Sequence, residues 1–403
     1  MSEQLAESIR ASYEPRSGET WRDPFPMYKA LRDQDPVHSF ETEQGTMWAL
    51  SRFKDVFTAA VDAATFSSAQ GLTMAYGDME RLGLQAPIVM MDPPDHTVLR
   101  KLAVKRFTPR QVLAVEPMIR EFVIGRVERL REEGKGDVVV ELFKPLPSLV
   151  VGHFLGVPPT DQPLFDRWTD AIVAANAAGE IGSSESGVGE LMTYFAGRVE
   201  EVRKNPGEDM ISSLVHSQID GKDIPLAKIL GFAFTMVTGG NDTTTGLLSG
   251  AAEHLTKNPD QRELLAKDRG RIVNAVEEFL RLASPVQGLA RMTTREVTIE
   301  DITIPKDRKV MLLYGSANRD EREFGPTAGE CDVTRKIKRH LALGYGPHHC
   351  IGAALARLQA RVALEELIGR CPNFTVDYAA GQFASGNYVR RYVSLPFSVN
   401  ASA

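Results

Sequence analysis

The longest helical pattern in the chain constrains its fold more than any other feature. Apolar residues recur at helical spacing from about Pro225 to His254. At 1.5 Å per residue, such a helix would be roughly 45 Å long, enough to cross the whole molecule. A helix of that length in a globular protein usually forms a central spine, so we expect shorter elements to pack around it.

The remaining pattern is mainly α, with small β-sheets toward the C-terminus. A hydroxyl N-cap followed by proline, Thr108-Pro109, predicts a helix that continues through Leu130 and stops at Gly134. Other helices are expected at about 24–33, 141–156, 161–177, 187–203 and 208–217, and strands at Val37–Phe40, Met47–Leu50, Val297–Ile304, Lys309–Tyr314 and Tyr388–Val399. Residues 1–20 are expected to be a flexible N-terminal tail. No repeat or linker marks a boundary, so residues 21–403 should form a single domain.

Composition excludes several classes of protein. The 403 residues are 43% hydrophobic, which is enough for a large core, and the net charge of −6 argues against nucleic acid as a partner. The polar N-terminus and the short apolar run Ile229–Val237 predict neither a signal peptide nor a membrane anchor. Three cysteines without a CxxC pair argue against a disulfide scaffold or a structural zinc site, and favour a reducing, cytoplasmic location.

The sharpest chemical signal is the segment from Leu343 to Gly352, LGYGPHHCIG. Two glycines and a proline predict a tight loop, and the residues after Cys350 predict an amphipathic helix. Cys350 would then lie at a helix N-terminus, where the helix dipole and free N–H groups favour a thiolate. Gly352 would let a flat ligand approach the backbone closely.

Three other interpretations of this segment have to be weighed. A dinucleotide-binding GxGxxG loop would need glycine at position 349, where His349 stands. A zinc site would use His348, His349 and Cys350, but three consecutive side chains cannot easily face one ion. A buried structural cysteine is the common state of a lone cysteine, and only the loop as a whole argues against it.

The loop resembles the haem-binding loop of the cytochrome P-450 superfamily, F-G-x-G-x-[HR]-x-C-x-G. It matches every fixed position but the first, where Leu343 replaces the usual phenylalanine, a difference that bears on the redox potential. The resemblance spans about residues 20–400 and implies the cytochrome P-450 fold, with the long helix over a haem b and the cysteine loop beneath it. It also implies that Cys350 ligates the iron, with Gly344 and Gly352 beside the cofactor. Segments such as GLTMAYGDME look like those of a soluble actinobacterial, mycobacterial-type member.

The long helix contains the polar stretch TGGNDTT, residues 238–244, which is unfavourable in mid-helix. It is similar to the family motif [AG]-G-x-[DE]-T-[ST]. The resemblance implies that Gly239 and Gly240 open a groove for dioxygen, that Thr243 hydrogen-bonds the bound oxygen, and that Asp242 relays protons. The alternative is a helix end with Asp242 as the N-cap of the next helix.

Glu278 and Arg281 form an E-x-x-R, which on its own would be a surface ion pair on one helix face. In the family it is a buried structural pair completed by a later arginine, for which Arg335 is the matching position. This group would support the fold and take no part in the chemistry.

His96 and Arg100 form an H-x-x-x-R, which could equally be a solvated stripe on a helix. The family uses this motif to bind the haem propionates, and Arg291 and His348 match its other propionate contacts. Charged donors suit this task, because buried carboxylates need pairing.

The implied activity is that of a monooxygenase, which inserts one oxygen atom from dioxygen into a small-to-medium apolar organic substrate. By position relative to the motifs, the substrate pocket would draw on residues 70–90, the 170s, Phe234, Val237, Gly240, Val286, Leu289 and Tyr388. Most of these side chains are apolar, which favours an apolar ligand.

Electrons would have to come from outside, because the chain has no flavin or nicotinamide fingerprint and no iron–sulfur cysteine set. We expect a ferredoxin and a ferredoxin reductase. Basic residues that could face an acidic ferredoxin are Lys101, Lys105, Arg106, Arg110, Lys336, Lys338 and Arg339. The alternatives are a peroxide-driven peroxygenase, disfavoured by Asp242 and Thr243, and a non-catalytic haem sensor or carrier, which would need neither those residues nor a redox partner.

Overall fold

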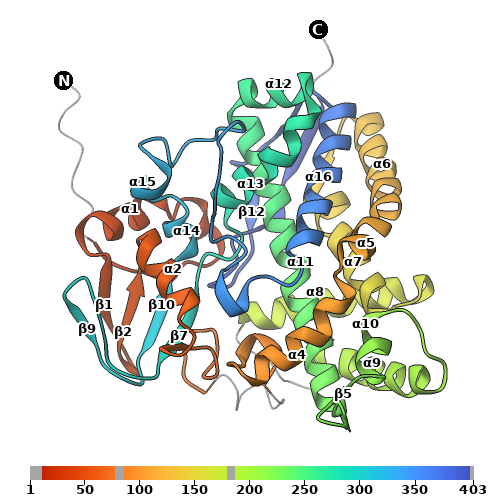
Figure 1. Ribbon diagram of the computed structural model, residues 1–403. Coiled ribbons are helices and arrows are strands. Elements are labelled where there is room, and N and C mark those ends of the chain that lie inside the picture. Colours follow the sequence, from red (N-terminus) through yellow and green to blue (C-terminus); the bar gives the residue numbers. More distant parts are fainter. Residues whose placement is uncertain (1–10, 78–85, 179–186, 400–403) are drawn as a thin grey trace, which may run out of the picture.

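The computed structural model describes residues 11–77, 86–178 and 187–399. Its longest helix, α11 (Leu226–Lys257), passes through the middle of the molecule (Figure 1) and confirms the expected spine to within three residues. Its 32 residues span roughly 48 Å. The helix ends at Lys257 with Asn258 as its C-cap, because Pro259 follows directly and has no N–H to continue the hydrogen-bond ladder.

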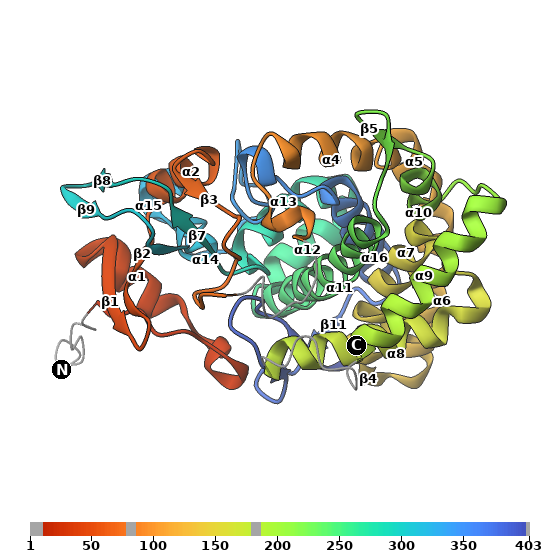
Figure 2. The same cartoon turned by 90° about the horizontal axis from the view of Figure 1, so that it is seen from below.

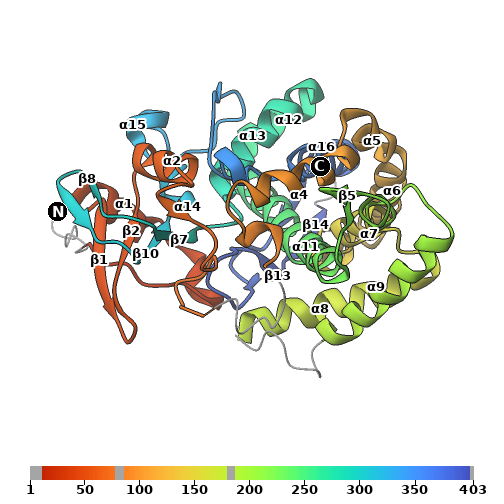
Figure 3. The same cartoon turned by 60° about the horizontal axis from the view of Figure 1, so that its bottom comes forward.

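Other helices surround this spine on one side of the molecule. They are α6 (Glu116–Glu133), α7 (Pro145–Leu155), α8 (Gln162–Ala178), α9 (Gly187–Lys204), α10 (Met210–Val215), α12 (Pro259–Lys267), α13 (Ile272–Ala283) and α16 (Ala353–Arg370). Helices α7, α8, α9, α13 and α16 all contact α11. Helices α8 and α9 run beside each other along one edge of the bundle (Figures 2 and 3). The apolar faces meet in one large core, in which Phe143, Phe195 and Phe232 are buried.

A five-stranded sheet forms the other side of the molecule (Figure 1). Its strands, in spatial order, are β1 (Val37–Thr42), β2 (Gly45–Leu50), β10 (Lys309–Leu312), β7 (Leu289–Thr293) and β3 (Phe66–Ser67). Strand β10 runs parallel to β2, and the other neighbours are antiparallel. In this register Val310 lies between Trp48 and Arg291. The short helices on this side are α1 (Phe25–Gln34), α2 (Phe53–Val61), α14 (Tyr314–Ala317) and α15 (Glu321–Phe324).

The remaining strands are short. A second sheet has the order β11 (Phe374–Val376), β14 (Pro396–Val399) and β4 (Lys135–Asp137), and two-stranded pairs join β5 (Gln218–Ile219) to β6 (Lys222–Asp223), β8 (Val297–Ile299) to β9 (Ile302–Ile304) and β12 (Gln382–Phe383) to β13 (Tyr392–Ser394). The predicted mainly α class with small sheets is therefore confirmed. Within the described ranges, no helix combines the length and the apolar character that a membrane span needs.

The helix expected from Thr108 to Gly134 is in fact two helices. Thr108 caps α5 (Pro109–Ala114) as predicted, because its hydroxyl accepts the N–H of Gln111, and Gly134 ends α6 with φ of 70°. The chain turns at Val115 between them. Pro117 is the reason: it lacks the N–H that a continuous helix would donate to the carbonyl of residue 113.

Three other segments differ from the expectation. The predicted strand 297–304 is a hairpin, because Glu300 and Asp301 adopt positive φ of 47° and 67° and turn the chain. The predicted strand at 309–314 stops at Leu312, and α14 begins at Tyr314. The end of the expected N-terminal tail is packed, since the Gly18 N–H donates to the carbonyl of Ala384; residues 1–10 lie outside the described residues. A single domain over 21–403 stays a prediction.

Candidate functional site

Cys350 lies in a loop that two glycines in the left-handed region allow. Gly344 has φ of 65° and Gly346 has φ of 69°. A Cβ atom on Gly346 would lie 2.7 Å from the carbonyl oxygen of Ala60 in α2, so a larger residue could not pack there. The N–H of Cys350 donates to the carbonyl of Leu343 at 2.8 Å and closes the loop. The loop thereby fixes the position of the thiol.

The surroundings of Cys350 in the polypeptide do not lower its pKa. Helix α16 begins at Ala353 with Gly352 as its N-cap, so Cys350 precedes the helix and only the Gly352 N–H reaches its sulfur. Burial raises the pKa of the Cys350 thiol and outweighs the opposite effects of that N–H, Arg100 and Arg357. The polypeptide by itself therefore favours the thiol. A thiolate requires a bound cation, because a coordinating thiol is deprotonated outright.

The Cys350 thiol opens onto a largely apolar space between the loop and α11, which we call the central cavity. It consists of two adjoining lobes that share Val89, Gly239, Thr243, Thr244, His348, Cys350 and Ala356. The first lobe adds Leu72, Val286, Leu289, Arg291, Gly344 and others, and the second adds Ile88, His96, Arg100, Val151, Phe232, Gly240, Gly352 and others. Because seven residues line both lobes, they belong to one site.

The structure brings some of the predicted pocket residues to the central cavity and leaves others away from it. Gly240, Val286 and Leu289 line the cavity. Phe234 and Val237 are buried in the core and do not line it. The ring of Tyr388 packs beside α1 and β10 instead, where its hydroxyl accepts the Met74 N–H at 3.3 Å. Of the predicted segments, residues 78–85 and 179 lie outside the described residues.

Helical geometry explains the error on α11. Successive residues advance by about 100°, so Val237 and Phe234 point about 160° and 140° away from Gly239. The face that lines the cavity carries Phe232, Thr235, Met236, Gly239, Gly240, Thr243, Thr244 and Leu247. Sequence reasoning missed Phe232, Met236 and Leu247, although their spacing from Gly239 and Thr243 was a sufficient signal. Val151 on α7 and Leu355 and Gln359 on α16 had no such signal, because only tertiary packing brings them here.

Five residues with imidazole or guanidinium side chains line the central cavity: His96 and Arg100 from α4 (Asp95–Ala103), Arg291 from β7, and His348 and His349 from the cysteine loop. The His96 and His348 rings lie 4.3 Å apart, and Arg100 donates to the carbonyl of His349. Burial lowers the pKa of His96; together with Arg291, His96 and Arg100 it lowers the pKa of His348 to about 3. In the absence of an anion His96 and His348 are therefore neutral, and the positive charge of this group is carried by Arg100 and Arg291.

This donor set fits a haem. The cavity offers a thiol for a metal and cationic donors for carboxylates. Nδ1 of His96 is buried and has no hydrogen-bond partner among the described residues. A Cβ atom on Gly239 would have nothing within 4 Å, so the α11 side has room for a flat group. These are the features that a flat, anionic, metal-bearing cofactor needs.

Asp242 and Thr243 are neighbours on α11, but they face different surroundings. The helix is continuous here, which excludes a helix end at Asp242. Thr243 lines the central cavity, and its hydroxyl donates to the carbonyl of Gly239 at 2.7 Å. Asp242 does not line the cavity; its Oδ1 lies 2.9 Å from Nε of Arg391. Sequence reasoning gave no signal for Arg391.

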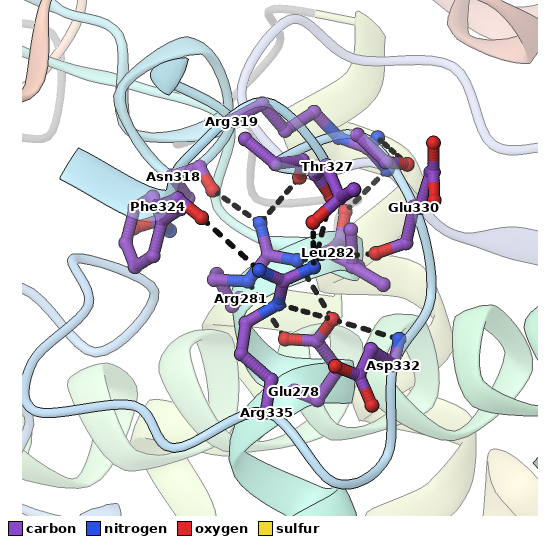
Figure 4. A network of polar contacts seen from close by, with 12 residues as sticks. Glu278, Arg281, Leu282, Asn318, Arg319, Phe324, Thr327, Glu330, Asp332 and Arg335 are labelled. Carbon is purple, nitrogen blue, oxygen red and sulfur yellow. Dashed lines mark hydrogen bonds and ion pairs between the residues drawn. The ribbon is translucent and has the colours of Figure 1, made fainter. Parts of the chain in front are cut away.

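The E-x-x-R pair is fully buried on α13, as expected (Figure 4). Arg281 donates to both carboxylate oxygens of Glu278 at 2.7 Å, and Nε of Arg335 reaches the same carboxylate at 3.2 Å. Arg281 also donates to the carbonyls of Asn318 and Ala328. The group thus ties α13 to the chain that leads into the cysteine loop, and it does not line the cavity.

Comparison with known proteins places the chain among cytochromes P450. A family model described as "Cytochrome P450" matches residues 189–381. Cytochrome P450 130 of Mycobacterium tuberculosis is 55% identical over 393 residues, which is 96% of this chain and 97% of the relative. Vitamin D(3) 25-hydroxylase of Pseudonocardia autotrophica is 35% identical over 89% of each chain. Among solved structures, cytochrome P450 CYP109Q5 from Chondromyces apiculatus superposes with a TM-score of 0.85 and 34% identity over 95% of this chain and 97% of that one.

Proposed function

This chain belongs to the cytochrome P450 family and is a P450 monooxygenase of actinobacterial type, and we propose that it inserts one oxygen atom from dioxygen into a small-to-medium apolar substrate. The observation that carries the proposal is the Cys350 thiol, which opens onto an apolar cavity whose lining includes His96, Arg100, Arg291 and His348. The family implies a haem, and we propose haem b. When bound, it would supply the activation of dioxygen and the redox chemistry.

The residues that would hold the cofactor come from three parts of the fold. Cys350 would ligate the iron, and Gly344 and Gly352 would leave space beside it. His96, Arg100, Arg291 and His348 would bind the two propionates. Arg100 and Arg291 would provide charge-assisted hydrogen bonds to the carboxylates, and His96 and His348 would donate ring N–H groups to them.

Thr243 and Asp242 would manage protons. The Thr243 hydroxyl donates to Gly239, which leaves its lone pairs free to accept a hydrogen bond inside the cavity. Asp242 would deliver protons to the cavity from outside it, since its carboxylate faces Arg391. Such a relay is needed because cleavage of the O–O bond consumes protons in a site that is otherwise closed to water.

The substrate would be apolar. Leu72, Val286 and Leu289 line one lobe, and Phe107, Val151 and Phe232 line the other, so few groups could bind a charged ligand away from the propionate donors. One relative is named as a vitamin D(3) hydroxylase, which supports a ligand of this general character.

A ferredoxin and its reductase would supply the electrons. Lys101, Lys105 and Arg110 are exposed on α4, α5 and the turn between them, and Lys336 and Lys338 are exposed ahead of the cysteine loop. These side chains would attract an acidic ferredoxin and chiefly raise the rate of association. Arg339 is also exposed but is paired with Glu323. We further propose a cytoplasmic location, which three unpaired cysteines support.

Spectroscopy of the reduced protein with carbon monoxide tests the central claim. The wild-type protein should give the strongly red-shifted Soret band of thiolate ligation, and Cys350→His should lose that band while retaining haem. Persistence of the band in the variant would show that Cys350 is not the ligand. Turnover with a ferredoxin system but not with peroxide would separate the monooxygenase from a peroxygenase, and no turnover with either would favour a sensor or carrier.

A further inference from the structure

The acid of the long helix is paired with an arginine from the far end of the chain. Nε of Arg391, just before β13, lies 2.9 Å from Oδ1 of Asp242. The Arg391 side chain is 7% exposed and that of Asp242 is 22% exposed, so the pair is mostly shielded from water. Shielding strengthens a charge-assisted hydrogen bond relative to one on the surface.

Close packing against α11 puts Arg391 in this place. Gly246 lies one turn beyond Asp242, and a Cβ atom there would be 2.8 Å from the carbonyl oxygen of Arg390 and 3.4 Å from Cβ of Arg391. Only glycine therefore lets the C-terminal segment lie directly on the helix. The approach is specific to this turn of α11.

The same segment is joined to the wall of the central cavity. The Arg390 N–H donates to the carbonyl of Pro285 at 2.8 Å, and Val389 pairs with Val286 in a β-bridge. Pro285 and Val286 both line the cavity. Arg391 thus connects the acid outside the cavity with the wall that a substrate would touch.

We propose that Arg391 is the positioning residue for Asp242: it holds the carboxylate on the outer side of α11, charged and in one orientation, ready to pass protons toward Thr243. This inference rests on the proposed proton-relay role of Asp242. Without the guanidinium, the carboxylate would lose its fixed place, and proton delivery would slow. Haem binding and the shape of the cavity would not change.

The test compares four variants of the haem-loaded protein. They are Arg391→Gln, Arg391→Lys, Asp242→Asn and the double variant that combines Arg391→Gln with Asp242→Asn. The readouts are dioxygen consumption driven by reduced ferredoxin, the share released as peroxide, and the dissociation constant of 4-phenylimidazole from its Soret shift. Arg391→Gln and Asp242→Asn should each slow dioxygen consumption about tenfold or more, since a positioned proton-transfer group contributes at least this much to the rate. The double variant should be no slower than Asp242→Asn alone, and Arg391→Lys should recover most of the rate. The affinity for 4-phenylimidazole should stay within about twofold, since one side chain outside the cavity is changed.

Arg390→Gln is the matched control, because Arg390 is equally buried in the same segment but pairs with Glu253. If Arg390→Gln slows dioxygen consumption at all, its factor should multiply with the factor of Asp242→Asn when the two substitutions are combined.

Two results would overturn the inference, and they are distinguishable. If Asp242→Asn slows the reaction and Arg391→Gln slows it further by its full factor, the relay stands and Arg391 does not act through it. The same conclusion follows if Arg391→Gln only weakens 4-phenylimidazole binding, because Arg391 would then merely support the cavity wall. If Asp242→Asn leaves the rate unchanged, the relay role itself is wrong, and the positioning role fails with it.

Discussion

Replacing Arg281 with alanine should destabilise the protein by about 5 kcal/mol. Arg281 and Glu278 are both 0% exposed, and the guanidinium makes both of its carboxylate contacts at 2.7 Å. Its loss leaves a buried carboxylate whose remaining polar contacts, among the residues that the structure describes, are with Arg335 at 3.2 Å and with the Asp332 N–H at 3.1 Å. Removing one partner of a buried ion pair typically costs about 3–5 kcal/mol, and each carbonyl left without its donor costs about 1–3 kcal/mol more where water does not replace it.

Thermal unfolding followed by far-ultraviolet circular dichroism measures this effect. For a chain of 403 residues, the entropy of unfolding is roughly 0.8 kcal/mol per kelvin, so the midpoint should fall by about 6 °C. Lys267→Ala is the control, because Lys267 forms an exposed ion pair with Glu263, at 69% and 65% exposure; it should shift the midpoint by less than about 1 °C.

A double variant tests the cause. Glu278→Leu together with Arg281→Leu removes the stranded charge and should recover part of the loss seen in Arg281→Ala. The reasoning would be refuted if Arg281→Ala melted no lower than Lys267→Ala. It would also fail if the double variant were less stable than Arg281→Ala, because the unpaired carboxylate would then not be the source of the loss.

Three further predictions concern other parts of the molecule. Glu277→Gln should cost about 3 kcal/mol in the free energy of unfolding at neutral pH. Burial raises the pKa of Glu277, but hydrogen bonds from Arg357 and His340 hold this pKa at about 2, below its ordinary 4.5. The stabilisation is therefore complete above pH 4.5 and is lost as the pH falls toward 2. Urea titrations across that range should show the free energies of unfolding of the two proteins converging. Thr243→Ala should bind ligands normally but release more peroxide per electron consumed, because the Thr243 hydroxyl would interact with bound oxygen and not with the substrate. An unchanged yield of product per electron would contradict this role of Thr243. Lys105→Glu and Arg110→Glu should slow reduction by ferredoxin and flatten its salt dependence without changing ligand affinity, since exposed charges act over about 8–10 Å. Equal reduction rates at low and high salt in the parent protein would show that these side chains are only solvated.

Several features were determined by the sequence itself because they depend on short-range geometry. Helical spacing places Glu278 and Arg281 on one face of α13, and the glycines at 344 and 346 allow the positive φ angles of the cysteine loop. The Thr108 cap and the extent of α11 follow from the same kind of local rule. The turn at Val115 is of the same local origin, since Pro117 lacks the N–H that a continuous helix needs.

Other features were decided only by tertiary packing. A helix repeats every 3.6 residues, so the periodicity identifies α11 as an apolar helix but does not show which face meets the cavity and which face meets the core. Phe234 and Val237, expected at the cavity, lie on the face that meets the core. The sequence likewise shows that Asp242 is acidic and in mid-helix, but not what it meets. That was settled by the close approach of residues 390–391 to Gly246, a contact between segments far apart in the chain. No local spacing encodes such a contact, because it depends on how whole elements pack against one another.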